Sequence, residues 1–139
     1  MDERELLSCL KAWFDAEQGA FPLTVTGSSM TPFVAPCRDT VYLYPYMGKI
    51  AKGDVILFRS STGRLMLHRA VKTGNMIVTA GDAFTYRDPG YAAEIYAVCG
   101  KIKRKNRIYT EKSLFWRFFS KIWVNIIPVR GVLLRIRKK

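Results

Sequence analysis

The sequence predicts a mainly β domain of antiparallel, coiled or barrel-like sheets, with a short N-terminal helix and a C-terminal amphipathic helix. Three observations carry this prediction. Short β-prone segments separated by turn residues fill the middle of the chain. Apolar residues recur at helical spacing near both ends. A length of 139 residues suffices for one domain with its own core, so no second domain is expected.

The N-terminal helix is predicted over residues 3–17. Its apolar side chains recur at helical spacing and form one face: Leu6, Leu7, Leu10, Trp13 and Phe14. Gly19 follows the last of them and is a typical helix stop. We expect this face to pack on the body of the domain.

Strands are predicted between this helix and residue 104. The first, residues 21–26, leads into a turn that carries Ser29, and Gly27 is expected to give the turn unusual backbone angles. Further strands are predicted at residues 40–44, 54–59, 65–72, 75–80 and 93–104. Short turns separate them, so neighbouring strands are expected to pair antiparallel.

The C-terminal helix is predicted over residues 113–127. One narrow polar stripe runs along it, formed by Ser113, Arg117, Lys121 and Asn125, and aromatic or aliphatic side chains cover the rest. Aromatic residues beside cations are typical of a helix in a membrane interface. The same pattern fits a helix that packs on the protein's own sheet or pairs with another subunit, and both interpretations stay open here.

Positive charge is concentrated near the C-terminus. The formal net charge is +12, and residues 101–139 hold thirteen basic side chains against the single acidic Glu111. Such a field attracts anionic partners. We expect residues 112–139 to make peripheral contact with an anionic membrane. Their apolar character argues against a solvated nucleic-acid arm, and the pattern does not specify an oligomeric state.

Targeting patterns and cysteine usage favour a cytoplasmic protein with peripheral contact at the inner face of the membrane. The first five residues are mainly acidic and no apolar stretch follows them. The uncharged run at 122–129 is far shorter than the ~20 residues that cross a bilayer. Three cysteines and one histidine predict neither a disulfide framework nor a metal site, and no motif predicts a cofactor.

Ser29 and His68 are the candidate chemical groups. A serine hydroxyl is a poor nucleophile at neutral pH unless a base lies within hydrogen-bond reach. His68 is the only histidine, and it lies on the strand predicted at 65–72. Taken singly, a serine in a turn and a histidine on a strand usually have structural roles. Their joint occurrence within a series of ordered motifs is what favours a catalytic role.

Four short motifs surround these residues in order: Gly-Ser-Ser-Met-Thr-Pro at 27–32, Gly53-Asp54, His68-Arg69 and Gly81-Asp82. In order and spacing they resemble the signal peptidase I and LexA-like serine peptidase clan, over about residues 22–103. Bacterial signal peptidases have a lysine where this chain has His68. The chain is therefore more similar to the archaeal and endoplasmic-reticulum branch, which uses serine and histidine.

The resemblance implies a Ser-His-Asp arrangement. Ser29 is the implied nucleophile and His68 the implied base. That branch has an aspartate six residues after the Gly-Asp motif, which here is Asp88, and Asp82 is the second choice. The implied oxyanion and positioning residues are Ser28, Ser29 through its backbone N–H, and Met30.

We therefore expect a serine endopeptidase domain at residues 1–110 and a basic amphipathic segment at residues 111–139. Its expected substrate is a peptide or the leader segment of a precursor protein, with small residues near the cleaved bond as the resemblance implies. Two alternatives stay open. One is a self-cleaving regulator like the LexA-type repressors, and the other is a non-catalytic binding module whose basic tail holds membrane or nucleic acid.

Overall fold

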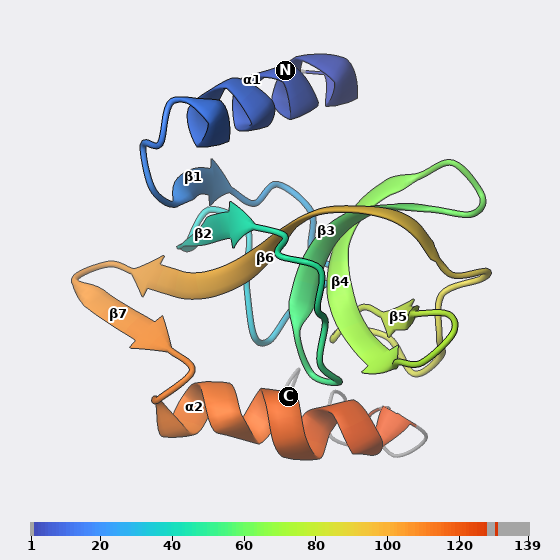
Figure 1. The fold of residues 1–139 in the computed structure, drawn as a ribbon. Coiled ribbons are helices and arrows are strands. Elements are labelled where there is room, and N and C mark those ends of the chain that lie inside the picture. Colours follow the sequence, from blue (N-terminus) through green and yellow to red (C-terminus); the bar gives the residue numbers. More distant parts are fainter. Residues whose placement is uncertain (1, 128–129, 131–139) are drawn as a thin grey trace.

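One antiparallel β-sheet dominates the fold (Figure 1). The computed structural model of the chain describes residues 2–127 and Arg130. In chain order the elements are α1 (Glu3–Asp15), β1 (Phe21–Thr24), β2 (Asp39–Pro45), β3 (Val55–Ser60), β4 (Leu65–Lys72), β5 (Val78–Ala80), β6 (Ala92–Arg104), β7 (Arg107–Thr110) and α2 (Leu114–Arg117). A π-helical turn (Phe118–Ile122) and a 3₁₀ turn (Trp123–Asn125) continue α2.

The strands lie in the order β1-β2-β6-β3-β4-β5, and β7 pairs with β6. Every pairing is antiparallel. The first half of β6 pairs with β3 and the second half with β2 and β7, so this long strand joins the two parts of the sheet. Among the described strands the sheet does not close into a barrel. The prediction of a mainly antiparallel β domain is confirmed.

The helix and strand predictions hold with five differences, the first of which is that β1 ends at Thr24 and not at residue 26. The N-terminal helix ends at Asp15, and β5 begins only at Val78. β7 was not predicted; it forms a hairpin with β6 across a turn in which Lys105 has a φ of 55°. The predicted C-terminal helix is not one regular α-helix, because only its first four residues, from Leu114, keep α-helical hydrogen bonding.

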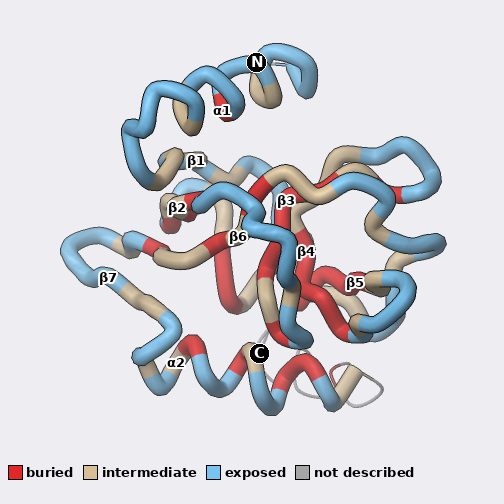
Figure 2. Tube along the Cα trace, in the orientation of Figure 1, coloured by how far each residue is buried: buried red, intermediate tan, exposed pale blue. Residues whose placement is uncertain are grey.

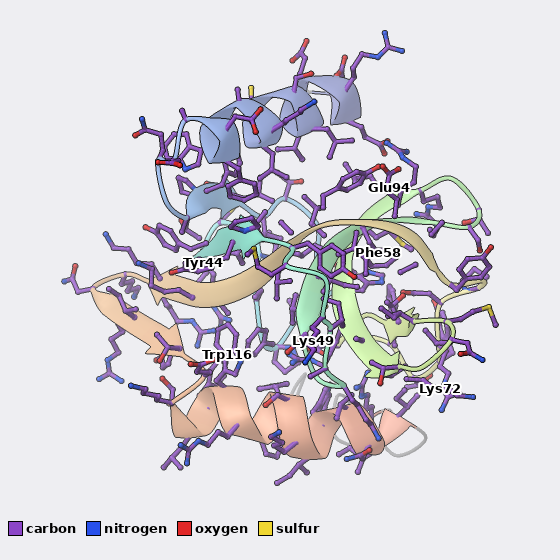
Figure 3. All side chains as sticks on the ribbon, viewed as in Figure 1. Tyr44, Lys49, Phe58, Lys72, Glu94 and Trp116 are labelled. Atoms are coloured by element: carbon purple, nitrogen blue, oxygen red, sulfur yellow. The ribbon has the colours of Figure 1, made fainter. Side chains whose placement is uncertain are left out.

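The C-terminal helical segment, residues 114–125, packs on the sheet. Trp116, Phe119 and Trp123 are buried in the main core together with sheet residues such as Val41 and Ile102. In Figure 3 Trp116 lies between the segment and the sheet, and Figure 2 shows buried and exposed positions alternating along the segment. The segment therefore packs on the protein's own body through these three aromatic side chains.

The segment approaches the turn before β3 very closely. Gly53 has a φ of +100°, and a Cβ there would overlap the backbone carbonyl of Ser120. Lys52 donates a hydrogen bond to the side chain of Asn125. Within the described residues, no helix combines the length and the apolar character that crossing a membrane requires.

Asp39, at the start of β2, ties the loop after the serine turn to the sheet. Its fully buried carboxylate accepts hydrogen bonds from Arg104 Nε at 2.8 Å, Arg38 Nη2 at 2.9 Å and the Ala35 N–H at 2.9 Å. Burial alone would raise the pKa of Asp39, but the hydrogen bonds from Arg104 and Arg38 outweigh it and leave this pKa below its ordinary value.

We expect the free energy of unfolding of Asp39→Asn to fall less than that of the wild type when the pH is lowered. Because the folded-state pKa of Asp39 is lowered, its carboxylate contributes stability above the ordinary value of 3.8. This contribution is lost as the pH falls through the lowered pKa. Urea unfolding of both proteins between about pH 2 and 7 measures the effect. Two curves that stay parallel over this range would contradict the role of Asp39.

Candidate active site

Ser29 lies in the turn that follows β1. The Ser28 carbonyl accepts hydrogen bonds from the backbone N–H and the hydroxyl of Thr31, which close the turn. The Ser29 carbonyl accepts a bond of 2.9 Å from the N–H of Ala83. The Gly-Asp motif therefore packs directly against the serine turn, and a Cβ on Gly81 would lie 2.6 Å from that same carbonyl oxygen.

Gly27 does not have the role that the sequence suggested. Its φ is not positive, and a Cβ there would meet no atom within 4 Å. The turn closes instead through the two hydrogen bonds to Ser28. A larger residue at position 27 would meet neither backbone strain nor a clash in this conformation.

His68 lies on β4 and is 5% exposed. The rings of Phe58 and Phe84 pack edge-on against its imidazole, with centroids at 6.5 and 6.0 Å. Its Nδ1 lies 2.6 Å from Oδ2 of Asp88. An ionised carboxylate can only accept, so this contact places the imidazole proton on Nδ1 and leaves Nε2 as a proton acceptor.

Asp88 is held in place by β5. The hydroxyl of Thr79 donates to Asp88 Oδ2 at 2.7 Å, and the Asp88 N–H donates to the Thr79 carbonyl at 2.8 Å. The side chains of Asp88 and His68 are 7% and 6% exposed. The loop that carries Asp88 is thus fixed at both backbone and side chain, and the imidazole is oriented by a carboxylate that cannot easily turn away.

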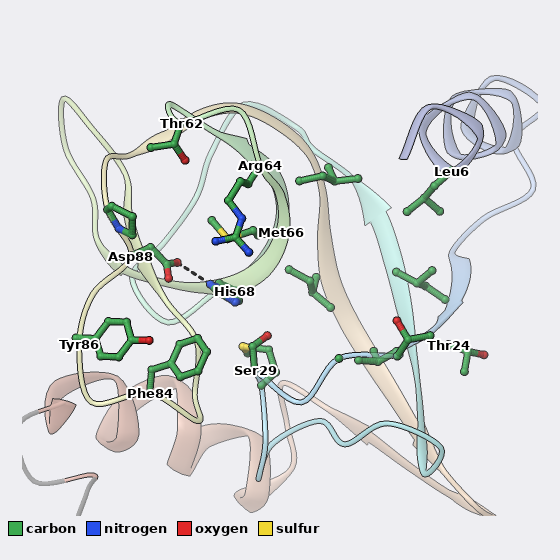
Figure 4. A pocket seen from close by; sticks show the side chains of 18 residues that line it. Leu6, Thr24, Ser29, Thr62, Arg64, Met66, His68, Phe84, Tyr86 and Asp88 are labelled. Carbon is green, nitrogen blue, oxygen red and sulfur yellow. Dashed lines mark hydrogen bonds and ion pairs between the residues drawn. The ribbon is translucent and has the colours of Figure 1, made fainter. Parts of the chain in front are cut away.

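Ser29, His68 and Asp88 line one pocket of about 590 Å³ (Figure 4). Figure 4 shows the Ser29 side chain directed toward the imidazole of His68. Within the described part of the chain no hydrogen bond joins Ser29 and His68, and none uses the Ser29 N–H. Among the described residues, neither the imidazole Nε2 nor the Ser29 N–H has a hydrogen-bond partner.

The two other predicted positioning residues differ in their surroundings. Met30 is buried, belongs to the main core and also lines the pocket. Ser28 is exposed and is not part of the pocket lining, and it stabilises the turn through its carbonyl.

Asp82, the second choice for the third residue, lies elsewhere. Its carboxylate forms two hydrogen bonds with Arg69, at 2.9 and 2.7 Å, and both side chains are fully buried. Arg69 also donates to the Gly53 carbonyl and lies over the ring of Phe33. Successive side chains of a strand point to opposite faces, so His68 reaches Asp88 on one face and Arg69 reaches Asp82 on the other.

Arg130 holds the loop between β5 and β6 from the C-terminal side. Its buried guanidinium donates to the carbonyls of Trp123, Gly81 and Phe84. Burial lowers the pKa of Arg130 to about 10, so the group stays charged at neutral pH. No salt bridge among the described residues includes Arg130; the three carbonyl acceptors and the nearby charge of Asp82 stabilise its guanidinium instead.

Cysteine and metal chemistry have weaker support in the same region. Burial raises the pKa of Cys99 to about 12, which leaves its thiol protonated and unreactive. Cys9 and Cys37 are exposed and do not line the pocket. Among residues 2–127 and Arg130, no group of three or more candidate side chains is placed to hold a metal ion.

Sequence reasoning missed two residues that organise this region. Thr79 supports Asp88, and alternation along β5 could have suggested that its hydroxyl points inward. Arg130 lies in the part of the sequence that charge alone assigned to the basic tail. No local signal in the sequence distinguishes it from the other basic residues of that tail.

Comparisons with known proteins give no assignment for the chain. No protein-family model, curated protein or solved structure matches it. What can be inferred about activity therefore depends on the motifs and on the geometry of the pocket that Ser29, His68 and Asp88 share.

Proposed function

We propose that the chain is a serine endopeptidase with the signal peptidase and LexA-like fold, acting on a peptide or a precursor segment. The observation that carries the proposal is the shared pocket, in which a carboxylate-bound imidazole faces a serine side chain. Ser29, His68 and Asp88 are separated in sequence by 39 and 20 residues. A structural role for each alone gives no reason for them to line one cavity.

The geometry supports acyl transfer to water. Ser29 Oγ attacks the peptide carbonyl carbon while Nε2 of His68 takes the hydroxyl proton, and Asp88 stabilises the imidazolium that forms. The Ser29 N–H can donate to the developing oxyanion. The C–N bond then breaks, His68 returns the proton to the leaving amine, and a water molecule activated by His68 hydrolyses the acyl-enzyme.

An extended peptide fits the walls of the pocket. One wall is the end of β1 with the segment that follows it, residues 23–27, and the opposite wall is the start of β4, residues 65–68. β5 pairs with β4 only from Arg69 onward, so within the described residues the β4 edge at 65–68 has no strand partner on this side. A substrate strand can add to such an edge through main-chain hydrogen bonds.

The proposal predicts peptide cleavage that depends on Ser29. We expect the full-length chain to generate new termini in a synthetic peptide library, read by mass spectrometry, and Ser29→Ala to abolish them. Ser8→Ala is a matched control because Ser8 is exposed on α1, outside the pocket. Cleavage that survives in Ser29→Ala, or no cleavage by the wild type, contradicts the proposal.

The same samples separate the self-cleaving alternative. The intact mass of the chain is followed during prolonged incubation without added peptide. We expect it to stay constant. A Ser29-dependent loss of N-terminal residues would favour a self-cleaving regulator instead.

A further inference from the structure

The outward face of the helical segment 114–125 carries an exposed apolar ridge. Leu114, Phe118 and Ile122, which we call the outer ridge, are 82%, 39% and 52% exposed. Residues four apart lie on nearly the same side of an α-helical turn and also of the wider π-helical turn that follows α2. Single exposed apolar residues are ordinary, but three in a row on one helical face form a continuous surface.

The opposite side of the segment is already occupied. Trp116, Phe119 and Trp123 are 8%, 5% and 4% exposed and belong to the main core. The segment therefore presents a fixed orientation, and these buried aromatic side chains cannot enter another surface without unfolding. Whatever binds here meets the outer ridge alone.

Cations accompany the outer ridge. Arg117 and Lys121 are exposed, each one residue before a member of the outer ridge, and Lys112 lies two residues before the start of the segment. None of the three forms an ion pair within the described part of the chain. From residue 112 onward the sequence contains eight basic side chains and no acidic one.

This combination selects among possible occupants. A second copy of the chain would bring the same cations against one another, which opposes a symmetric contact. Nucleic acid would match the charge but leave two aliphatic side chains without a purpose, because bases stack on aromatic or guanidinium planes. An anionic bilayer satisfies both features, with apolar side chains below the headgroups and cations among the phosphates.

We propose that the outer ridge and its flanking cations dock the protein on the surface of an anionic lipid bilayer, with the segment 114–125 parallel to the membrane plane. Leu114, Phe118 and Ile122 enter the boundary between headgroups and acyl chains. Arg117 and Lys121 bind headgroup phosphates. The attachment is peripheral and reversible, and it does not depend on the peptidase activity proposed above.

Flotation with lipid vesicles tests the docking surface. The full-length chain is mixed with vesicles of phosphatidylcholine containing phosphatidylglycerol, or of phosphatidylcholine alone, at low and high salt. We expect flotation with the anionic vesicles at low salt and a strong reduction at high salt. Failure to float with anionic vesicles at low salt overturns the proposal.

Two double variants separate the ridge from general charge attraction. Leu114→Ser with Ile122→Ser is expected to weaken binding several-fold at unchanged net charge. Arg117→Glu with Lys121→Glu is expected to weaken it about tenfold or more. The matched control is Arg4→Glu with Lys11→Glu, which makes the same charge change on exposed positions of α1 and is expected to bind more tightly than the segment variant.

All four positions are exposed, so thermal unfolding is expected to show native midpoints in both segment variants. Full vesicle binding by the Leu114→Ser, Ile122→Ser variant would contradict the role of the outer ridge. Membrane binding would then be due to charge attraction by the basic residues alone. Equal losses of vesicle binding in the Arg117→Glu, Lys121→Glu variant and the Arg4→Glu, Lys11→Glu variant would contradict the proposal that this particular face binds the membrane. A ridge-dependent dimer in light scattering, without flotation, would assign the surface to a second copy.

Discussion

Alanine at Ser29 or at His68 is expected to lower peptide turnover by a factor on the order of 10⁴ or more. The first change removes the nucleophile, and the second removes the group that accepts its proton. Because the two act as one unit, the double variant is expected to be scarcely slower than either single variant. Initial rates on a peptide identified in the library, with circular dichroism to verify folding, measure the effect.

Asp88→Asn is expected to lower kcat less than either alanine variant does. We expect its kcat to remain roughly 10- to 100-fold above that of the alanine variants. Asparagine keeps the size of the side chain but cannot stabilise the imidazolium, and it favours the wrong tautomer of His68. Turnover retained by His68→Ala would contradict the proposed mechanism. A greater loss with Asp82→Asn, at full stability, would assign the third role to Asp82.

Asp82→Asn is expected to destabilise the fold by about 3–5 kcal/mol, which for a chain of this size lowers the thermal midpoint by about 10 °C or more. The reason is the buried pair with Arg69, whose side chains are both fully buried. Without the carboxylate, the guanidinium stays buried with its charge uncompensated. Thermal and urea unfolding of the variant measure this loss.

Two controls separate burial from charge pairing in general. Glu3→Gln breaks an ion pair with Arg59 whose two side chains are 57% and 32% exposed, and it is expected to leave the midpoint nearly unchanged. Arg69→Met with Asp82→Leu removes both buried charges and is expected to be more stable than Asp82→Asn alone. Equal midpoints for Asp82→Asn and Glu3→Gln would show that the buried pair does not stabilise the fold.

Much of the sheet could be predicted from local patterns. β4 was predicted with its observed bounds, Leu65 to Lys72, and β2, β3 and β6 to within about a residue at each end. Of these strands, β2, β3 and β6 are rich in β-branched or aromatic residues, whereas β4 was recognised by its position between two turns. β7 is only four residues long and carries Arg107 at its start, so its sequence resembles the basic tail more than a strand.

The partner of the C-terminal segment could not be predicted in the same way. Its composition fits both a membrane interface and a protein core, and only tertiary contacts decide which aromatic residues are buried. Phe33 illustrates this, because it packs against Phe115, Trp116 and Phe119 although about eighty residues separate them in sequence. The spacing of apolar residues indicates which face of a helix is apolar, but it does not indicate what packs against that face.

The candidate site shows a similar division. The motifs and the resemblance that they carry selected Ser29, His68 and Asp88, and these three line one pocket. The sequence alone does not show that Asp88 pairs with His68 and Asp82 with Arg69, because both aspartates lie in the loop after β5. Their pairing depends on the direction that the chain takes in this loop. That direction depends on contacts with Thr79 and Arg130.

The hydrogen bonds of Arg130 have a consequence for the order in which the protein matures. Arg130 donates to the carbonyls of Gly81 and Phe84, and the loop between them contacts Ser29 through the Ala83 N–H. The loop is thus joined to a residue far along the chain. A ribosome delivers the chain from its N-terminus, so these bonds form only after Arg130 has emerged. The loop that packs on the serine turn is therefore held by Arg130 only late in synthesis, after the sheet residues on both sides of it have already emerged.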